Sequence, residues 1–213
     1  HIFERVAHGV RLNTAGELLI KHARDQIADL DRVKSQIADL SGIRRGHVTI
    51  ACSQALLPYF MPEQIAAYRA EHDAVTFSVK LRDRAAAEEE LLTYAADIAL
   101  VFEPVRLADF DPLTRVRQHV HVMMAPDHPL AQKDPLRLSD CLRYPHALPS
   151  SAYGVRFLLE RATRRMPDLL RPVIESDSFE FLRYYIANES VVAFQIPVGL
   201  PPAGSDHWLV ERE

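Results

Sequence analysis

The chain has 213 residues, 48% of them hydrophobic and 25% charged, values typical of a soluble globular protein with one large domain or two small lobes. A formal net charge of -4 argues against a nucleic-acid-binding surface over the whole chain, and two cysteines, Cys52 and Cys141, are too few for a disulfide scaffold and lack zinc-site spacing. No stretch of about 20 apolar residues could span a membrane and the N-terminus lacks the apolar core of a secretory signal, so we expect a cytoplasmic protein.

The N-terminal end carries the basic part of the chain. Residues 1–46 hold eight Lys and Arg against six Asp and Glu, a balance of +2, whereas the remainder has a balance of -6. Because phosphate groups attract cations, any affinity for DNA is expected at this end. Arg5 and Arg11 flank a short turn at Gly9, like a hairpin laid along DNA. We expect phosphate or minor-groove contacts from both, with simple solvation as the alternative.

A long helix is predicted next. Asn13 or Thr14 can cap its start, with Glu17 completing a capping box, and residues 41–42 supply a stop. Its apolar positions mostly follow a three-four spacing: Ile20, Ala23, Ile27, Leu30, Ile37 and Leu40. Such a seam favours pairing with a second helix, and packing on its own domain is the alternative. Dimerisation is the better interpretation, because polar residues cover the other faces and 42–46 has the composition of a hinge.

From His47 onward, short strands alternate with helices. Strands are predicted at 47–52, 75–81, 97–102, 113–125, 147–148, 173–176 and 191–196. Helices are predicted at 62–70, 85–94, 138–143, 155–165 and 179–188. This alternation predicts an α/β fold with mainly parallel sheets and helices on both faces. The series divides near residue 122, so two Rossmann-like lobes with a cleft between them fit better than one wide sheet.

Polar and aromatic residues follow several of these strands, at the end where open α/β sheets bind ligands. Three such segments also precede a helix, whose N-terminus favours an anion such as a small carboxylate by about 0.3–1 kcal/mol. Alternatively, the polar residues only cap their helices and the aromatic ones pack in the core. The candidate ligand-binding residues are Ser53, Gln54, Phe102, Ser150, Ser151, Tyr153, Ser178, Phe179 and Ile196.

The chain lacks the motifs of common enzymes. There is no Gly-x-Ser-x-Gly, phosphate loop or dinucleotide fingerprint, so we predict no enzymatic activity, catalytic residue or cofactor. His119 and His121 face the same side of a predicted strand, but no acidic or cysteine partner has ligand spacing. We therefore predict no metal site, and buried thiols for both cysteines.

Several motifs, in their order along the chain, resemble the bacterial LysR-type transcriptional regulators. Phe-Glu-Arg from Phe3 and Val-Arg-Leu-Asn-Thr-Ala-Gly up to Gly16 are similar to the wing and the start of the linker helix in that family. Later segments resemble its effector domain: Arg45-Gly-His-Val-Thr-Ile-Ala, Asp97-Ile-Ala-Leu, Pro126-Asp-His-Pro-Leu and the run from Ala187 to Pro197. Asn13 replaces the usual Thr, and Asn188 and Ser190 replace the usual glycines.

The resemblance implies a periplasmic-binding-protein-like effector domain of two lobes, preceded by a wing remnant and a dimerisation helix. It divides the chain into a winged helix-turn-helix remnant at 1–13, a linker helix at 14–42, lobe I at 46–122 plus 196–213, and lobe II at 123–195. The helix-turn-helix itself is expected upstream of His1.

The implied function is that of a ligand-responsive transcriptional regulator. A small-molecule effector in the inter-lobe cleft would alter how a homodimer or homotetramer contacts double-stranded DNA. Two other classes share the fold. A solute-binding receptor for transport would need a secretion signal but no basic wing or helical seam. A repurposed sensor that oligomerises without binding DNA is the third possibility.

Overall fold

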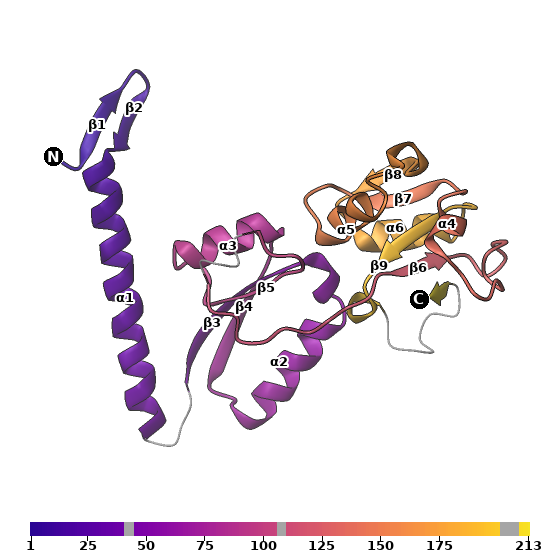
Figure 1. Ribbon diagram of the computed structural model, residues 1–213. Coiled ribbons are helices and arrows are strands. Elements are labelled where there is room, and N and C mark those ends of the chain that lie inside the picture. Colours follow the sequence, from indigo (N-terminus) through magenta and orange to yellow (C-terminus); the bar gives the residue numbers. More distant parts are fainter. Residues whose placement is uncertain (41–44, 106–109, 201–208) are drawn as a thin grey trace.

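The computed structural model describes residues 1–40, 45–105, 110–200 and 209–213 and shows a hairpin with a long helix beside two α/β lobes (Figure 1). Each lobe is built on its own sheet, of three strands in lobe I and five in lobe II. The predicted fold class is confirmed: an α/β fold of two lobes, preceded by a wing and a long helix. Within the described ranges, no helix has the length and apolarity needed to cross a membrane.

The N-terminal hairpin pairs β1 (Phe3–Val6) with β2 (Gly9–Leu12) in antiparallel register. The turn requires glycine because Gly9 has a φ of +140°, which other residues rarely adopt. The hairpin rests on the next helix, since a Cβ at Gly16 would clash with the carbonyl oxygen of Ile2. Gly9 is therefore needed for the hairpin turn, and Gly16 for the contact between the hairpin and the helix.

Helix α1 (Thr14–Leu40) begins and ends where the capping signals and the apolar spacing predict. The Asn13 side-chain oxygen accepts the N–H of Gly16 at 3.0 Å, so Asn13 is the capping residue and Thr14 is not. The predicted stop at 41–42 and the first part of the hinge lie outside the described residues. Helix α1 stands apart from both lobes in the single chain (Figure 1).

Lobe I carries a parallel sheet of strand order β4-β3-β5. Its elements are β3 (Gly46–Cys52), the 3-10 helix η1 (Gln54–Leu56), α2 (Phe60–Glu71), β4 (Val75–Leu81), α3 (Arg84–Leu92) and β5 (Ile98–Leu100). Successive residues of β3 point to opposite faces. Ile50 and Cys52 pack toward α2 with Met61, whereas Ala51 packs toward α3 with Ala87. The alternation thus gives each face its own small core.

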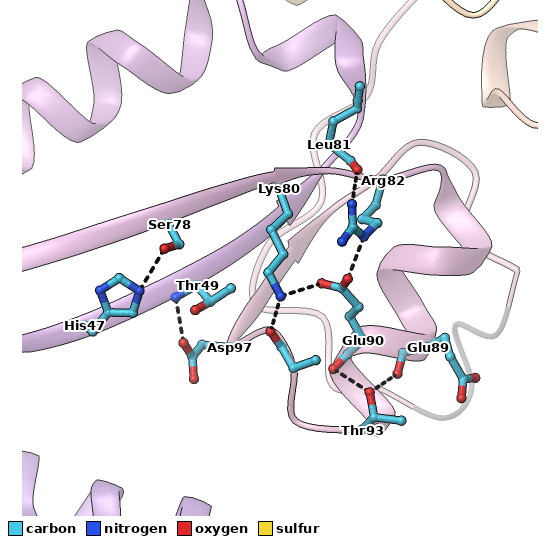
Figure 2. Close-up of polar contacts among 11 residues, drawn as sticks. His47, Thr49, Ser78, Lys80, Leu81, Arg82, Glu89, Glu90, Thr93 and Asp97 are labelled. Atoms are coloured by element: carbon cyan, nitrogen blue, oxygen red, sulfur yellow. Dashed lines mark hydrogen bonds and ion pairs between the residues drawn. The ribbon is translucent and has the colours of Figure 1, made fainter.

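Polar contacts join the α3 side of this sheet to the segments that connect its strands (Figure 2). Thr49 donates its backbone N–H to the Asp97 carboxylate at 2.7 Å, which fixes the entry into β5. Glu90 on α3 accepts from Arg82 Nε at 2.5 Å and lies 3.3 Å from Lys80 Nζ, which joins α3 to β4. Burial alone would raise the pKa of Glu90, but the hydrogen bonds from Arg82 and Lys80 outweigh it and lower the pKa. Glu90 is therefore held as a carboxylate between two cations.

Lobe II carries a mixed sheet of strand order β10-β6-β9-β7-β8. Its strands are β6 (His121–Met124), β7 (His146–Pro149), β8 (Pro172–Ser176), β9 (Val192–Gln195) and β10 (Val210–Arg212). Its helices are α4 (Leu138–Cys141), α5 (Gly154–Ala162), η3 (Pro167–Leu169), α6 (Phe179–Ile186) and η4 (Pro197–Gly199). Leu182 and Ile186 of α6 pack on one face of the sheet, whereas Cys141 of α4 and Leu159 of α5 pack on the other.

Three details of lobe II differ from the sequence prediction. The sheet is not mainly parallel, because β6 runs antiparallel to both β9 and β10. The strand predicted at 113–125 is reduced to His121–Met124, and Leu113 and Val116 are exposed on the connection between the lobes. The segment 196–213 was placed in lobe I, yet Val210–Arg212 pairs with β6 of lobe II.

Candidate functional site

The segments that follow the parallel strands of both lobes meet between the lobes. Gln54, just after β3, reaches across: its side-chain oxygen accepts the backbone N–H of Phe179, the first residue of α6, at 2.7 Å. Two of the predicted ligand-binding residues are thus brought together by one hydrogen bond between the lobes. Gln54 thereby accepts a hydrogen bond from one of the free N–H groups at the start of a helix.

A cavity of about 230 Å³ lies beside this bond. Lobe I contributes Gln54, Ala55, Leu57 and Pro58, and lobe II contributes Phe179, Glu180, Arg183 and Gln195. The volume is below the usual range for drug-sized ligands, roughly 300–1,000 Å³, and suits a small metabolite. The polar groups that line it come mainly from lobe II.

Two charged groups line this cavity, the exposed Glu180 and the buried Arg183, which is only 3% exposed. One guanidinium nitrogen donates to the carbonyl oxygen of Gly199 at 3.2 Å, and the guanidinium carbon lies 5.6 Å from the centre of the Tyr59 ring. Among the residues that the structure describes, no carboxylate forms an ion pair with Arg183. A buried cation without a counter-ion is costly, and an anion in the cavity would lower that cost.

Gln195, at the end of β9, is fully buried and lines the same cavity. Its side-chain nitrogen donates to the Gly199 carbonyl oxygen at 2.7 Å, while its side-chain oxygen has no partner in the described part of the chain. A buried acceptor left unpaired costs roughly 1–3 kcal/mol. A hydroxyl group of a ligand would satisfy it. The cavity is thus lined by a buried cation and by a buried amide whose oxygen has no partner among the described residues.

The serines predicted for the site have different surroundings. Ser53 is buried and makes no side-chain capping bond to η1, so capping does not account for it. Ser178 does cap α6, because its hydroxyl accepts the N–H of Phe181 at 3.1 Å. Ser150 and Ser151 form the turn before α5 and do not line the cavity. Ser53 does not line the cavity either, but it directly precedes Gln54, which does.

The aromatic candidates pack against each other. The Tyr153 and Phe179 rings meet edge to face with centroids 5.3 Å apart, and the Tyr153 hydroxyl donates to the Asp177 carbonyl oxygen at 3.2 Å. Burial, and then the charges of Asp177 and Asp83, raise the pKa of Tyr153. Ile196 belongs to the lobe II core. Tyr153 does not line the cavity, and the two aspartates near it disfavour an anion beside its ring.

Backbone contacts join the lobes closely at two points. A Cβ at Gly154 would lie 2.8 Å from the carbonyl oxygen of Phe102, the remaining predicted residue, which packs in the cores of both lobes. A Cβ at Gly199 would lie 2.7 Å from the carbonyl oxygen of Ala55. Both glycines permit the backbone of lobe II to touch that of lobe I.

Side chains from both lobes reinforce this junction. The Arg84 guanidinium of α3 lies 4.9 Å from the centre of the Phe157 ring on α5. The Arg161 guanidinium of α5 lies 3.7 Å from the Glu103 carboxylate, which follows β5. The cavity is thus built where the two lobes are held together.

The residues predicted for DNA contact and dimerisation lie far from this cavity. Arg5 is exposed on β1, and Arg11 pairs with Glu4 across the hairpin. The predicted helical seam is open to solvent: Ile27, Leu30 and Ile37 are 62%, 55% and 61% exposed, and Ile20 and Ala23 are exposed as well. Both surfaces are free of the lobes in the single chain.

The cysteines and the paired histidines give no sign of catalysis. Cys52 and Cys141 are free and buried, and burial raises the pKa of each thiol to about 11. His121 lies 2.6 Å from the Glu211 carboxylate and His119 lies 3.2 Å from that of Glu213, contacts that hold β10 beside β6. The described residues contain no group of three or more acidic, histidine or cysteine side chains placed to hold a metal ion.

Two α/β lobes around a small polar cavity define a class of ligand-binding domain. The family model described as the LysR substrate binding domain matches residues 41–203, which is most of the chain, and the chain belongs to this family. The resemblance in its motifs is thereby confirmed.

Individual relatives agree with this assignment. The chain is 26% identical over 166 residues to YbhD of Escherichia coli, described as an uncharacterized HTH-type transcriptional regulator, covering 78% of this chain and 52% of YbhD. It has a TM-score of 0.67 at 17% identity to HinK, a LysR family transcriptional regulator from Pseudomonas aeruginosa, covering 94% of this chain and 68% of HinK. For the effector binding domain of QuiR in complex with shikimate, the TM-score is 0.66 at 16% identity, with coverages of 78% and 79%. The chain spans about half the length of the curated relatives it matches.

Sequence reasoning missed Arg183 and Gln195. A signal for Arg183 existed: it lies four residues after Phe179 on a predicted helix, so the two share one helix face. Gln195 is a polar residue at the end of an otherwise apolar strand, which marks a buried amide in need of a partner. Neither signal depends on knowing the fold.

Proposed function

We propose that this chain is the sensor part of a ligand-responsive transcriptional regulator, and that a small carboxylate binds between the lobes with its anionic group on Arg183. The observation that supports this most strongly is the buried Arg183 guanidinium, which faces the cavity without a carboxylate partner among the described residues. The unpaired oxygen of Gln195 extends the proposal to a carboxylate that also carries a hydroxyl group.

The relatives support the same class of function. QuiR binds shikimate, a hydroxylated carboxylate, in its effector binding domain. YbhD is described as a transcriptional regulator with a helix-turn-helix. In the full-length protein, we propose that a helix-turn-helix reads the operator while Arg5 and Arg11 contact phosphates. Such contacts position a protein on DNA without specifying the sequence.

Ligand binding would act through the junction of the lobes. Gln54 of lobe I and Arg183 and Gln195 of lobe II line the cavity, so a ligand that contacts both lobes binds best to one lobe arrangement. That differential affinity is what a ligand needs to shift an equilibrium. We propose that helix α1 pairs with its copy in a homodimer, or in a homotetramer built from such dimers, and carries the shift to the DNA-binding units.

Titration calorimetry with a panel of small carboxylates, shikimate among them, tests the ligand site. Arg183→Gln is expected to weaken binding by about tenfold or more, because it removes a charge-assisted hydrogen bond worth roughly 1.5–3 kcal/mol. Arg143→Gln, an exposed arginine outside the cavity, is the matched control and should bind normally. Equal affinity in both variants would refute the role of Arg183.

Ser53→Ala is the second variant, chosen because its hydroxyl does not cap η1 and its loss should leave the fold intact. The full-length protein carrying it should keep its affinity for its own upstream DNA, measured by fluorescence anisotropy, but lose the response to the carboxylate. If Ser53→Ala unfolds the protein, the residue is structural. A full-length protein that binds the carboxylate but no DNA at low salt would belong to a receptor class instead.

A further inference from the structure

A second and larger cavity, of about 510 Å³, lies within lobe II. It is located between the sheet and the helices α4 and α5, with Val122 of β6 and Phe194 of β9 among its lining residues. Helix α4 has four residues and covers only part of this face. None of the residues that line the cavity belongs to the site between the lobes.

The walls of this lobe II cavity are mostly apolar. Leu138 and Cys141 line it from α4, and Leu158 and Leu159 from α5. Burial raises the pKa of the Cys141 thiol to about 11, so the thiol stays neutral near pH 7 and acts as an apolar group. A volume of this size with apolar walls is usual for small organic ligands.

Charged groups lie at the same cavity. Arg137 and Arg161 contribute two guanidinium groups, and Glu213 contributes one carboxylate that lies 3.2 Å from the His119 ring. Arg161 makes its ion pair with Glu103 at 3.7 Å with 61% of its side chain exposed, and such a pair stabilises little. Among the lining residues two guanidinium groups stand against one carboxylate, and Glu103, which does not line the cavity, screens Arg161 only weakly because their ion pair is exposed, so the field at the cavity favours a negatively charged group.

We propose that this cavity is a second small-molecule site, which takes an organic acid with an apolar body. The body would lie against Val122, Phe194 and Leu159, and the carboxylate on Arg137 and Arg161. This site is separate from the one proposed between the lobes and takes a different ligand, because its walls offer an apolar surface in place of a hydroxyl partner.

The position of Arg161 links this site to the junction of the lobes. Its guanidinium lies beside Glu103 of lobe I, so an acid bound to it would compete for the same charge. Binding in lobe II would therefore loosen one of the contacts between the lobes. By reciprocity, a ligand that tightens the junction would weaken binding of the acid.

Titration calorimetry with 2-naphthoate, which joins an apolar ring system to one carboxylate, tests the site. Ala162→Leu fills the cavity from an exposed position at the end of α5, where leucine is compatible with the helix. It should weaken binding by about tenfold or more, as should Arg137→Gln combined with Arg161→Gln. Arg165→Gln removes an exposed charge that does not line the cavity and should bind normally.

Three results would overturn the proposal: no binding of 2-naphthoate at millimolar concentration, unchanged binding in Ala162→Leu, or equal binding of uncharged 2-naphthol. The second result would place the ligand elsewhere, and the third would mean that the arginines recognise nothing. Shikimate titrated into Ala162→Leu separates the two proposals, because the site between the lobes contains no lining residue of this cavity.

Discussion

Replacing Gly199 by alanine is expected to push the lobes apart. The new Cβ would lie 2.7 Å from the Ala55 carbonyl oxygen, about 0.7 Å closer than ordinary contact, which begins at 3.4 Å. The Gln195 side-chain nitrogen would lie at 2.6 Å, and the Ala55 oxygen is backbone and cannot rotate away as a side chain would. Overpacking of this kind costs roughly 1–3 kcal/mol of the free energy of unfolding. Because the Gly199 carbonyl also accepts from Arg183 and Gln195, the movement should weaken ligand binding between the lobes.

A second glycine makes the test decisive. Gly154→Ala would place a Cβ 2.8 Å from the Phe102 carbonyl oxygen, at a different point of the same junction. Neither glycine has a positive φ that alanine would strain, so the added atom alone causes the effect. Urea unfolding of the wild type, both single variants and the double variant gives the free energies of unfolding.

If both substitutions open one junction, the second should cost little once the first has opened it. The double variant should then lose less stability than the sum of the two single variants, by more than about 0.5 kcal/mol. Losses that add within that margin would show two independent local strains, and the reasoning about a common junction would be wrong.

Three further predictions concern the helix, the buried histidines and lobe I. Ile27→Asp with Leu30→Asp should yield a monomer by light scattering, since both side chains are exposed in the single chain; an unchanged mass would refute pairing through α1. Burial lowers the pKa of His146 and of His128, so as the pH falls toward about 6.5 the unfolded chain takes up protons at these two residues more readily than the fold does. Stability should therefore fall between pH 7.5 and 5.5, by at most about 1.4 kcal/mol per pH unit and histidine, and a flat profile in urea unfolding would contradict this. Glu90→Gln should lower the free energy of unfolding by about 1 kcal/mol through its lost contacts with Lys80 and Arg82, while the exposed Glu63→Gln should not.

Elements whose signals are local were predicted well. Helix α1 was placed from its cap at Asn13 and its apolar spacing, and β3 from its β-branched run. Strand β10 was missed because three residues are too few to show an alternation of apolar and polar side chains. They form a strand only because they pair with β6. The exposed segment around Leu113 and Val116 failed for the converse reason: its composition suits a strand, but no described strand pairs with it.

Two residues of the candidate site could be predicted from the ends of strands. Gln54 and Phe179 follow two strands that are distant in the chain, and the topology of the parallel strands brings them within one hydrogen bond. Tertiary packing decided the other candidates. The Ser178 hydroxyl caps its own helix, and the Tyr153 ring packs against Phe179 in the core. Local sequence does not distinguish a free polar group from a satisfied one.

The charges around the site also limit how a ligand can lie in it. Burial, and then the charges of Asp177 and Asp83, one from each lobe, raise the pKa of Tyr153, so the surroundings of its ring disfavour an anion. Arg183 and Gln195 both line the cavity. Arg183 is a buried cation, and the side-chain oxygen of Gln195 is an unpaired acceptor among the described residues. A carboxylate placed toward Tyr153 would be repelled by both aspartates, whereas one placed on Arg183 neutralises a buried charge. The ligand should therefore bind with its acid group on Arg183 and its hydroxyl group near Gln195, both on lobe II, and with its neutral end toward Gln54 of lobe I.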